Sequence, residues 1–351
     1  MNLTRRNLLE RLSWAGGALA IGAPRIVSAA GPDHDWDWLT GSWDVWHRRL
    51  KKRLAGNDDW DEFAGKSSFW HLMGGLANMD ENLLYLPAGT YRGMSLRAYD
   101  PSTRKWAIWW LDLRTAGKLD PPVLGGFVGD EGEFHGKDVF DDKPIDVRFR
   151  WHEVHGKRPW WDQSFSPDGK KTWETNWRNY FTRTSASATA IPRSSDEAPL
   201  PAEANDWAFL VGRWRVKNRK RVPDGSWAEF DSTLNNWTVM GGLANVADNE
   251  FHAPTGSYRG VSIRAFDTKA KVWRSWWLDG RTPHDIGTPV AGSFKDGVGT
   301  LLGEDEADGR RLQVRSQWSR VETKTPRWEQ ATSTDGVKWE TNWEADFQRQ
   351  S

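Results

Sequence analysis

Apolar and polar residues alternate with a period of two along much of this chain. Met94 and Leu96 alternate with Ser95 and Arg97, and residues 147–152 repeat the pattern. Successive side chains of a β-strand point to opposite faces, so this alternation predicts strands with one apolar and one polar face. We find no amphipathic pattern long enough for a helix of three turns beyond the first thirty residues.

Turn-forming sequences separate the predicted strands at regular intervals. Examples are Leu-Pro-Ala-Gly at 86–89, Asp-Pro-Ser at 100–102 and Gly-Asp-Glu-Gly at 129–132, which are residue types that favour tight turns. About eight to ten short antiparallel strands in a unit of about 150 residues predict a sandwich or a closed barrel, and closure removes the exposed sheet edges. The fold class that we expect is therefore all-β.

The chain contains the same unit twice. Gly-Gly-Leu-Ala-Asn at 74–78 returns at 241–245, and Trp-Trp-Leu-Asp at 109–112 returns at 276–279, both at a shift of 167 residues. A copy of about 150 residues is long enough to bury its own core. The sequence therefore predicts two domains in tandem.

The expected domain boundaries follow from composition. Domain 1 covers residues 33–183 and domain 2 covers residues 205–351, and between them residues 184–204 are rich in Ser, Ala and Pro without any apolar period. Such a segment is typical of an exposed linker.

The first thirty residues are typical of an export signal. Residues 4–9 carry a twin arginine, residues 14–27 are modestly apolar, and small residues follow at 27–30, a pattern that resembles a Tat signal. A membrane anchor is the weaker interpretation because Pro24 and Arg25 interrupt a short apolar stretch. We expect a periplasmic or secreted protein without a membrane span after signal cleavage.

Composition excludes several classes of function. The chain has no cysteine, which rules out disulfides, thiol catalysis, zinc–thiolate and iron–sulfur sites. Lys plus Arg equals Asp plus Glu at 48 each, without a basic block, so we expect no nucleic-acid partner. Twenty-six Trp against five Tyr indicate thick aromatic cores or surfaces on which flat ligands stack, with core packing the larger share.

Each copy opens with Gly-x-Trp and closes with an arginine. This order resembles the lipocalin and wider calycin superfamily, in which the Trp closes one barrel end and the late Arg lies across it. With the repeated Trp-Trp-Leu-Asp and Ser-x-Asp-Gly sequences, both copies most resemble the bacterial lipocalin-like domains called DUF1579. The resemblance implies two tandem antiparallel lipocalin-like barrels of about eight to ten strands. The residues concerned are Gly41, Trp43 and Arg183 in copy one, and Gly212, Trp214 and Arg349 in copy two.

Polar residues inside predicted strands define the candidate ligand-binding site, because a charge in a half-buried strand is costly unless it is paired or used. Period two puts the Trp, Asp and Arg of residues 106–114 on one face, and two further strands add Tyr, Arg and Gln. The candidates are Tyr91, Arg97, Trp110, Asp112, Arg114 and Gln163 in copy one, and Tyr258, Arg264, Trp277, Asp279, Arg281 and Gln330 in copy two.

Two orientations of these faces stay open. If the polar faces line the lumen, the chain is an exported protein that binds a small molecule, such as a sugar or an oxygenated aromatic, between indoles. If the apolar faces point inward, the same residues form surface ladders, and a register shift of one residue exchanges the two interpretations. The Asp–Arg pair could equally be a structural ion pair at the barrel rim.

Enzymatic and structural alternatives also stay open. A cofactor-independent lyase, hydratase or hydrolase would use Tyr91 or Asp112 as a general base, or Asp112 with Glu174 as paired carboxylates. A scaffold without usable cavities is the third alternative, because Trp is large enough to fill a small barrel. Ligand identity and protein partners cannot be inferred.

Histidines do not recur between the copies. His47 aligns with Asn218 and His152 with Ser319, which argues against a Ser–His–acid triad and against metal or haem sites used by both copies. We expect no metal and no cofactor. A haem-binding barrel stays as a further alternative, since a Tat signal favours cofactor proteins.

Overall fold

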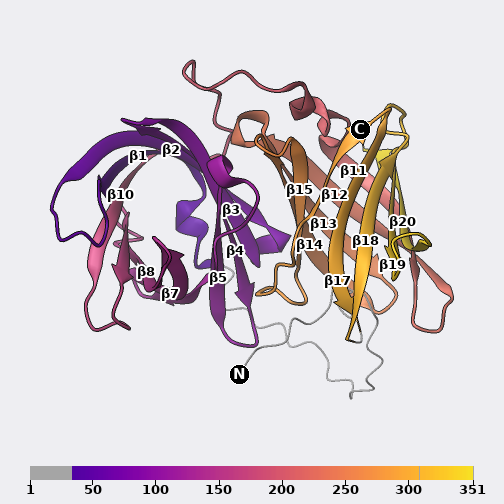
Figure 1. Cartoon of the computed structure of the whole chain (residues 1–351), viewed down its shortest axis with the longest axis horizontal. Coiled ribbons are helices and arrows are strands. Elements are labelled where there is room, and N and C mark those ends of the chain that lie inside the picture. The colour runs from indigo at the N-terminus through magenta and orange to yellow at the C-terminus, as the bar shows by residue number, and fades with distance from the viewer. Residues whose placement is uncertain (1–33, 308, 351) are drawn as a thin grey trace. The chain divides into compact units, whose positions relative to one another are not determined.

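The computed structural model describes residues 34–307 and 309–350. The predicted export signal therefore lies outside the described residues. Strands and short 3₁₀ turns make up the regular structure of the described part (Figure 1). Among these residues we find no helix with the length and apolar character that crossing a membrane requires.

Barrel 1 is a closed meander of ten antiparallel strands (Figure 1). Each strand pairs with the next along the chain, and the ring closes because the first strand, β1, also pairs with the last, β10. The strands are β1 (Gly41–Leu50), β2 (Trp60–Leu72), β3 (Ala77–Leu86), β4 (Gly89–Asp100), β5 (Lys105–Asp112), β6 (Val123–Val128), β7 (Glu131–Phe140), β8 (Lys143–His152), β9 (Trp160–Ser166) and β10 (Glu174–Ser185).

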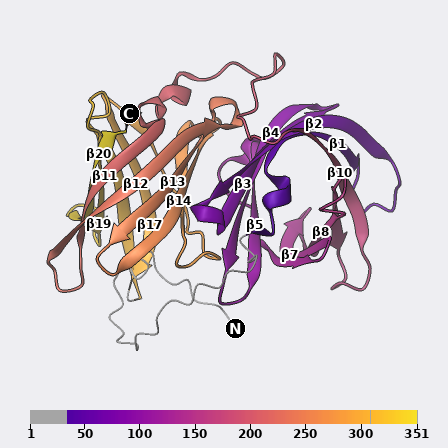
Figure 2. The ribbon, with the colours of Figure 1, turned by 180° about the vertical axis from the view of Figure 1, so that it is seen from behind.

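Barrel 2 repeats this topology with ten further strands, closed by the pairing of β11 with β20 (Figure 2). The prediction of two tandem all-β barrels is thus confirmed, with ten strands in each. The strands are β11 (Gly212–Arg221), β12 (Trp227–Val239), β13 (Ala244–Ala253), β14 (Gly256–Asp267), β15 (Val272–Asp279), β16 (Val290–Lys295), β17 (Val298–Ala307), β18 (Arg310–Ser319), β19 (Arg327–Ser333) and β20 (Glu340–Arg349).

A tryptophan-rich plug closes one end of each barrel. In barrel 1 the chain enters through Trp36 and the 3₁₀ turn η2 (Asp37–Leu39), and the fully buried Trp36 indole packs edge-on against Trp106 and Trp151, with ring centroids 6.1 and 5.8 Å away. In barrel 2 the equivalent Trp207 is 2% exposed. Edge-to-face contacts of this kind add to the stability gained from burying the rings.

The predicted Trp–Arg closure is present in both barrels. The Arg183 guanidinium lies 4.0 Å from the Trp43 ring and donates hydrogen bonds to the carbonyl oxygens of Trp38 and Thr40. The indole N–H of Trp43 donates to Leu39 O at 2.7 Å. In barrel 2 the guanidinium carbon of Arg349 lies 4.3 Å from the ring of Trp214. The arginine therefore fastens the entering chain to the end of the barrel.

Glycine begins each Gly-x-Trp motif for a backbone reason. Gly41 has φ +117° and Gly212 has φ +122°, conformations that side chains with a Cβ rarely adopt. A Cβ on Gly41 would also lie 2.2 Å from Ser185 O. The motif thus combines a backbone turn with the closing indole.

Part of the segment between residues 184 and 204, which we expect to be an exposed linker, packs on barrel 1. Arg92, on the outer face of β4, donates to the carbonyl oxygens of Ile191 and Pro192 at 3.0 and 2.7 Å and forms an ion pair with Glu197. Ile191 itself is buried. Arg92 thus donates hydrogen bonds to the backbone of this segment, and composition alone does not predict such a contact.

Removing the closing indole should destabilise barrel 1 strongly. Trp43→Ala should lower its free energy of unfolding by about 3–5 kcal/mol, because it deletes a buried aromatic ring. Arg183→Ala should cost less, about 1–2 kcal/mol, because its cation–π contact and the two hydrogen bonds that it donates are exposed to solvent. Differential scanning calorimetry of the full chain measures both, with Trp214→Ala as a matched control that should affect the transition of barrel 2. Equal losses for Trp43→Ala and Arg183→Ala would contradict this account.

Candidate ligand-binding cavities

Barrel 1 encloses a cavity of about 280 Å³ in its lumen. All six residues predicted for copy one line it, although they come from β4, β5, the turn after β5 and β9. The structure thus brings together Tyr91, Arg97, Trp110, Asp112, Arg114 and Gln163. Their role in binding a ligand stays a prediction.

The polar faces of these strands point into the lumen. Ser95 and Arg97 of β4 line the cavity, whereas their apolar neighbours Met94 and Leu96 do not. The alternative of polar surface ladders is therefore wrong for these strands of barrel 1. Polar groups in the lumen lie among aromatic and aliphatic side chains.

The Trp110 indole lies directly on the backbone of the neighbouring strand. A Cβ added to Gly93 of β4 would come within 2.2 Å of the indole ring, and Gly260 and Trp277 repeat this contact at 2.3 Å. Glycine at this position permits the close approach. The ring therefore packs directly against the backbone at Gly93.

Asp112 and Arg114 form the predicted ion pair at the end of the cavity farthest from the plug. Arg114 Nε and Nη2 donate to Asp112 Oδ1 and Oδ2 at 3.0 and 2.6 Å, and the guanidinium carbon lies 3.6 Å from the centre of the Tyr91 ring. Asp112 Oδ1 also accepts the Arg114 backbone N–H at 2.8 Å. The pair is therefore partly structural, since it ends β5, but it still lines the cavity.

A second ion pair lies against the plug. Arg97 donates to Asp80 and, at 3.2 Å, to Asn78 Oδ1, while its guanidinium carbon lies 4.5 Å from the centre of the Trp36 ring. Asp80 Oδ1 also accepts the Ser95 backbone N–H at 3.3 Å. The positive charge of Arg97 is thus neutralised inside the barrel.

Gln163 adds an amide group to the polar wall of the cavity. Gln163 Nε2 donates to Asn176 Oδ1 at 2.9 Å. Glu174, considered above as a partner for Asp112, does not line the cavity, and its Oε1 accepts the Leu54 backbone N–H at 2.7 Å. The paired-carboxylate arrangement for glycoside hydrolysis is therefore not formed.

Several further lining residues were missed from the sequence, among them His47 and Arg49 of β1, and Arg53 and Asp120 of loops. His47 and Arg49 follow the same period-two face as Trp43, so the pattern itself could have revealed them. The loop residues carry no periodic signal. Burial, together with the nearby Asp138, raises the pKa of Asp120 to about 6.

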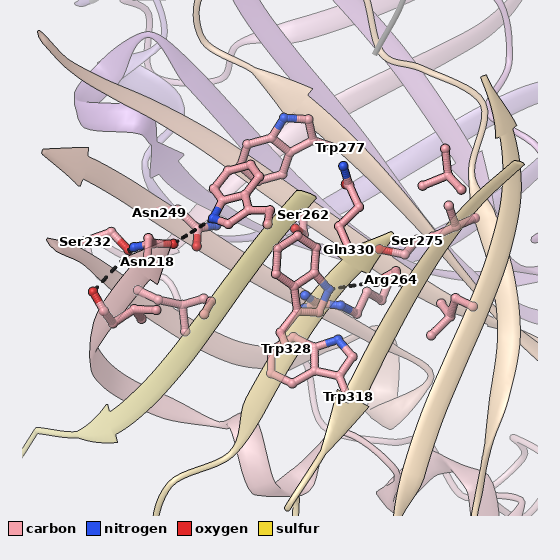
Figure 3. A pocket seen from close by; sticks show the side chains of 18 of the residues that line it. Asn218, Ser232, Asn249, Ser262, Arg264, Ser275, Trp277, Trp318, Trp328 and Gln330 are labelled. Carbon is pink, nitrogen blue, oxygen red and sulfur yellow. Dashed lines mark hydrogen bonds between the residues drawn. The ribbon is translucent and has the colours of Figure 1, made fainter. Parts of the chain in front are cut away.

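Barrel 2 encloses a smaller cavity of about 150 Å³ (Figure 3). Of the residues predicted for copy two, Arg264, Trp277 and Gln330 line it. The prediction is wrong for the cavity position of the other three, Tyr258, Asp279 and Arg281, which do not line it.

The missing residues are separated from the cavity by an aromatic substitution. The Asp279–Arg281 pair forms as in barrel 1, and the Arg281 guanidinium carbon lies 3.8 Å from the centre of the Tyr258 ring. Phe251, however, occupies the position that Leu84 holds in barrel 1, as the matching pairs Phe251–Tyr258 and Leu84–Tyr91 show. Its ring stacks on Tyr258 with centroids 4.7 Å apart and fills the space next to the pair.

Apart from Arg264, the polar groups that line the cavity of barrel 2 are neutral. Asn218 Nδ2 donates to Ser232 Oγ at 2.8 Å, and the indole N–H of Trp343 donates to Asn218 Oδ1 at 3.1 Å (Figure 3). No Asp or Glu of the described chain belongs to its lining. Within residues 34–307 and 309–350, we also find no group of three His, Cys, Asp or Glu side chains arranged to hold a metal ion.

Acidification should destabilise barrel 1 through His47. Burial lowers the pKa of His47 from 6.5 to about 4. As the pH falls, His47 is therefore protonated in the unfolded chain before it is protonated in the folded one. The contribution of the neutral ring is complete above pH 6.5 and is lost towards pH 4, by at most roughly 3 kcal/mol. Melting temperatures across this range measure the effect. His47→Asn, which introduces the residue found at the matching position 218 of barrel 2, should weaken the pH dependence of the melting temperature. An unchanged pH dependence in this variant would show that other titrating groups cause it.

The chain has distant similarity to solved structures. A protein of unknown function from the DUF3598 family of Nostoc punctiforme is 12% identical over 92% of this chain and 100% of that one, with a TM-score of 0.28. A putative AttH from Nitrosomonas europaea is 10% identical over 93% and 98%, with a TM-score of 0.16. Kievitone hydratase from Nectria haematococca is 11% identical over 95% and 97%, with a TM-score of 0.14.

No family model and no curated protein matches the chain. The resemblance to DUF1579 domains therefore stays a prediction. At such low identities and TM-scores, the solved structures carry no argument about function, which has to rest on the residues of the cavities.

Proposed function

We propose that the protein binds a small polar ring compound, such as a sugar or an oxygenated aromatic, in the lumen of barrel 1. One observation carries the proposal: a single cavity of about 280 Å³ gathers all six predicted residues of copy one. Ligand sites generally combine mostly apolar walls with a few convergent polar groups. This cavity combines aromatic and aliphatic side chains with polar groups from several strands.

The cavity offers a flat surface beside directional polar groups. A ring that stacks on Trp110, which packs against the backbone at Gly93, would meet the Asp112–Arg114 pair at one side. Gln163 of β9 offers an amide group that Asn176 orients from behind, through the hydrogen bond from Gln163 Nε2 to Asn176 Oδ1. Because the volume is slightly below the usual range of about 300–1,000 Å³ for ligand pockets, we expect a ligand of one or two rings.

We also propose that the chain is an exported member of the DUF1579-like lipocalin domains, placed in the periplasm or secreted. The twin arginine at residues 5 and 6 and the paired Gly-x-Trp motifs support this. Fractionation of cells that express the full chain tests the location.

Loss of the ion pair should weaken ligand binding without unfolding the barrel. In a calorimetric screen of sugars and phenolics, Asp112→Asn and Arg114→Gln should each weaken binding of the best ligand about tenfold or more, because each removes a charged hydrogen-bonding group. The melting temperature should stay nearly unchanged, since the pair is partly exposed. Asp279→Asn, the matched change outside the cavity of barrel 2, should leave affinity intact. A large loss of stability with unchanged affinity would make the pair purely structural.

Acid–base catalysis in barrel 1 is a second candidate function, favoured by Asp120. Its carboxyl lines the cavity and its pKa, raised to about 6, lies near neutral pH, as a general base requires. At the equivalent place barrel 2 has Gly287, so the reaction would belong to barrel 1.

If barrel 1 converts the ring compound that it binds, the rate should rise with pH through about 6 as Asp120 loses its proton. Asp120→Asn should then lower the rate by about 10²–10⁴-fold and abolish this rise. The pH–rate profile of the wild-type and variant proteins measures both effects. A ligand that binds but is recovered unchanged would leave binding as the sole function.

A further inference from the structure

Arg264 is a buried cation without a carboxylate partner. It lines the cavity of barrel 2, it is 5% exposed, and its Nη1 donates to Asn245 Oδ1 at 2.8 Å. Within the described ranges, none of the ion pairs includes Arg264. Burial of an uncompensated charge is costly, so such a group marks a candidate functional site.

Neutral groups hold the guanidinium in place. The amides of Asn236 and Asn245 donate to each other at 2.7 and 2.6 Å, which fixes the Asn245 oxygen towards Arg264. The ring centres of Trp207 and Trp318 lie 4.2 and 5.8 Å from the guanidinium carbon. These contacts stabilise the cation without cancelling its charge. Burial lowers the pKa of Arg264 to about 9, which still leaves it charged at pH 7.

Barrel 1 has a carboxylate at the position where barrel 2 has none. Arg97 and Asn78 pair across β3 and β4 as Arg264 and Asn245 pair across β13 and β14. At the next inward position barrel 1 has Asp80, which forms an ion pair with Arg97, and barrel 2 has Ala247. The counter-charge is therefore built into one barrel and absent from the other.

Besides Arg264, Lys220 of β11 faces the lumen of barrel 2, and burial lowers the pKa of its ammonium group to about 7. Lys220 follows Asn218 on the inward face of β11, is buried, and has its Nζ 4.4 Å from the centre of the Trp343 ring. Asp279 is an acid whose charge acts on Lys220, and it already forms an ion pair with Arg281. Among the described residues that line this cavity, Arg264 is therefore the sole charged side chain, and it lies among indoles.

We propose that the cavity of barrel 2 binds a small organic anion with a single ring, a carboxylate or phenolate, and that Arg264 supplies the counter-charge. This rests on the proposed function in one respect, since it assumes that these barrels take up small molecules. A cavity of about 150 Å³ holds a molecule the size of benzene. The planar guanidinium matches a carboxylate, and Trp277, Trp318 and Trp328 provide ring-stacking surfaces (Figure 3).

Calorimetric titration of the full-length protein with benzoate, and with neutral benzamide of the same shape, tests the charge requirement. Benzoate should bind about ten- to hundredfold more tightly than benzamide, because only benzoate forms a charge-assisted hydrogen bond. Ala247→Asp should weaken benzoate binding to a similar extent, since it restores the neutralising carboxylate of barrel 1. Arg264→Gln should do the same. Ala247→Asp keeps the proposal testable if Arg264→Gln fails to fold.

The reciprocal change in barrel 1 is the matched control. Asp80→Ala should add a second benzoate site, because it leaves Arg97 without its counter-charge. Ala247→Asp should leave the binding of a neutral ring compound in barrel 1 unchanged. Equal affinities for benzoate and benzamide, or benzoate binding that Ala247→Asp does not weaken, would overturn the inference. A wild-type protein that binds the neutral compound but no benzoate would overturn it while leaving the proposed function of barrel 1 standing.

Discussion

The pairing of the first strand of each barrel with the last is the constraint on which the rest of the structure depends. Without it, a ten-stranded meander would keep two exposed edges. The stacked pair lies on this closing ladder, since Trp43 faces Arg183 and Trp214 faces Arg349 in its register. Because side chains alternate between the two faces, fixing this register fixes which residues of every strand face the lumen. The composition of both cavities therefore follows from how the barrels close.

The lumens of the two barrels differ in their inward-facing side chains although the strand pairing is the same. Phe69, Asp80 and Leu84 of barrel 1 correspond to Asn236, Ala247 and Phe251 of barrel 2. These substitutions change inward side chains and leave the backbone ladders intact, so the fold tolerates them. Barrel 1 thus has a larger cavity in which Asp80 pairs with Arg97, and barrel 2 has a smaller one in which Arg264 has no carboxylate partner. A duplicated barrel can in this way carry two different specificities on one scaffold.

Much of the fold and part of the site could be predicted from the sequence. Alternation revealed the strands, and Gly-x-Trp with a late Arg revealed the closure, because both depend on local geometry. The direction of the polar faces could not be decided, since a single sequence has the same period for either face. Tyr258 lies outside the cavity because Phe251, its neighbour on the adjacent strand, covers it. The period-two pattern of a single strand does not predict which residue lies across the sheet. Asp120 lies in a loop, where no periodicity exists to place it.

The contact between Gly93 and Trp110 has a consequence for how such a site can evolve. The indole rests on main-chain atoms, which every substitution of neighbouring side chains leaves in place. Mutations around the ring can therefore alter hydrogen-bonding partners or charge while the stacking surface persists. Gly260 and Trp277 preserve the same arrangement in barrel 2, although the surrounding lumen has changed its charge. After gene duplication, a barrel with a fixed aromatic surface can acquire a new ligand specificity through a few substitutions of the polar residues around it.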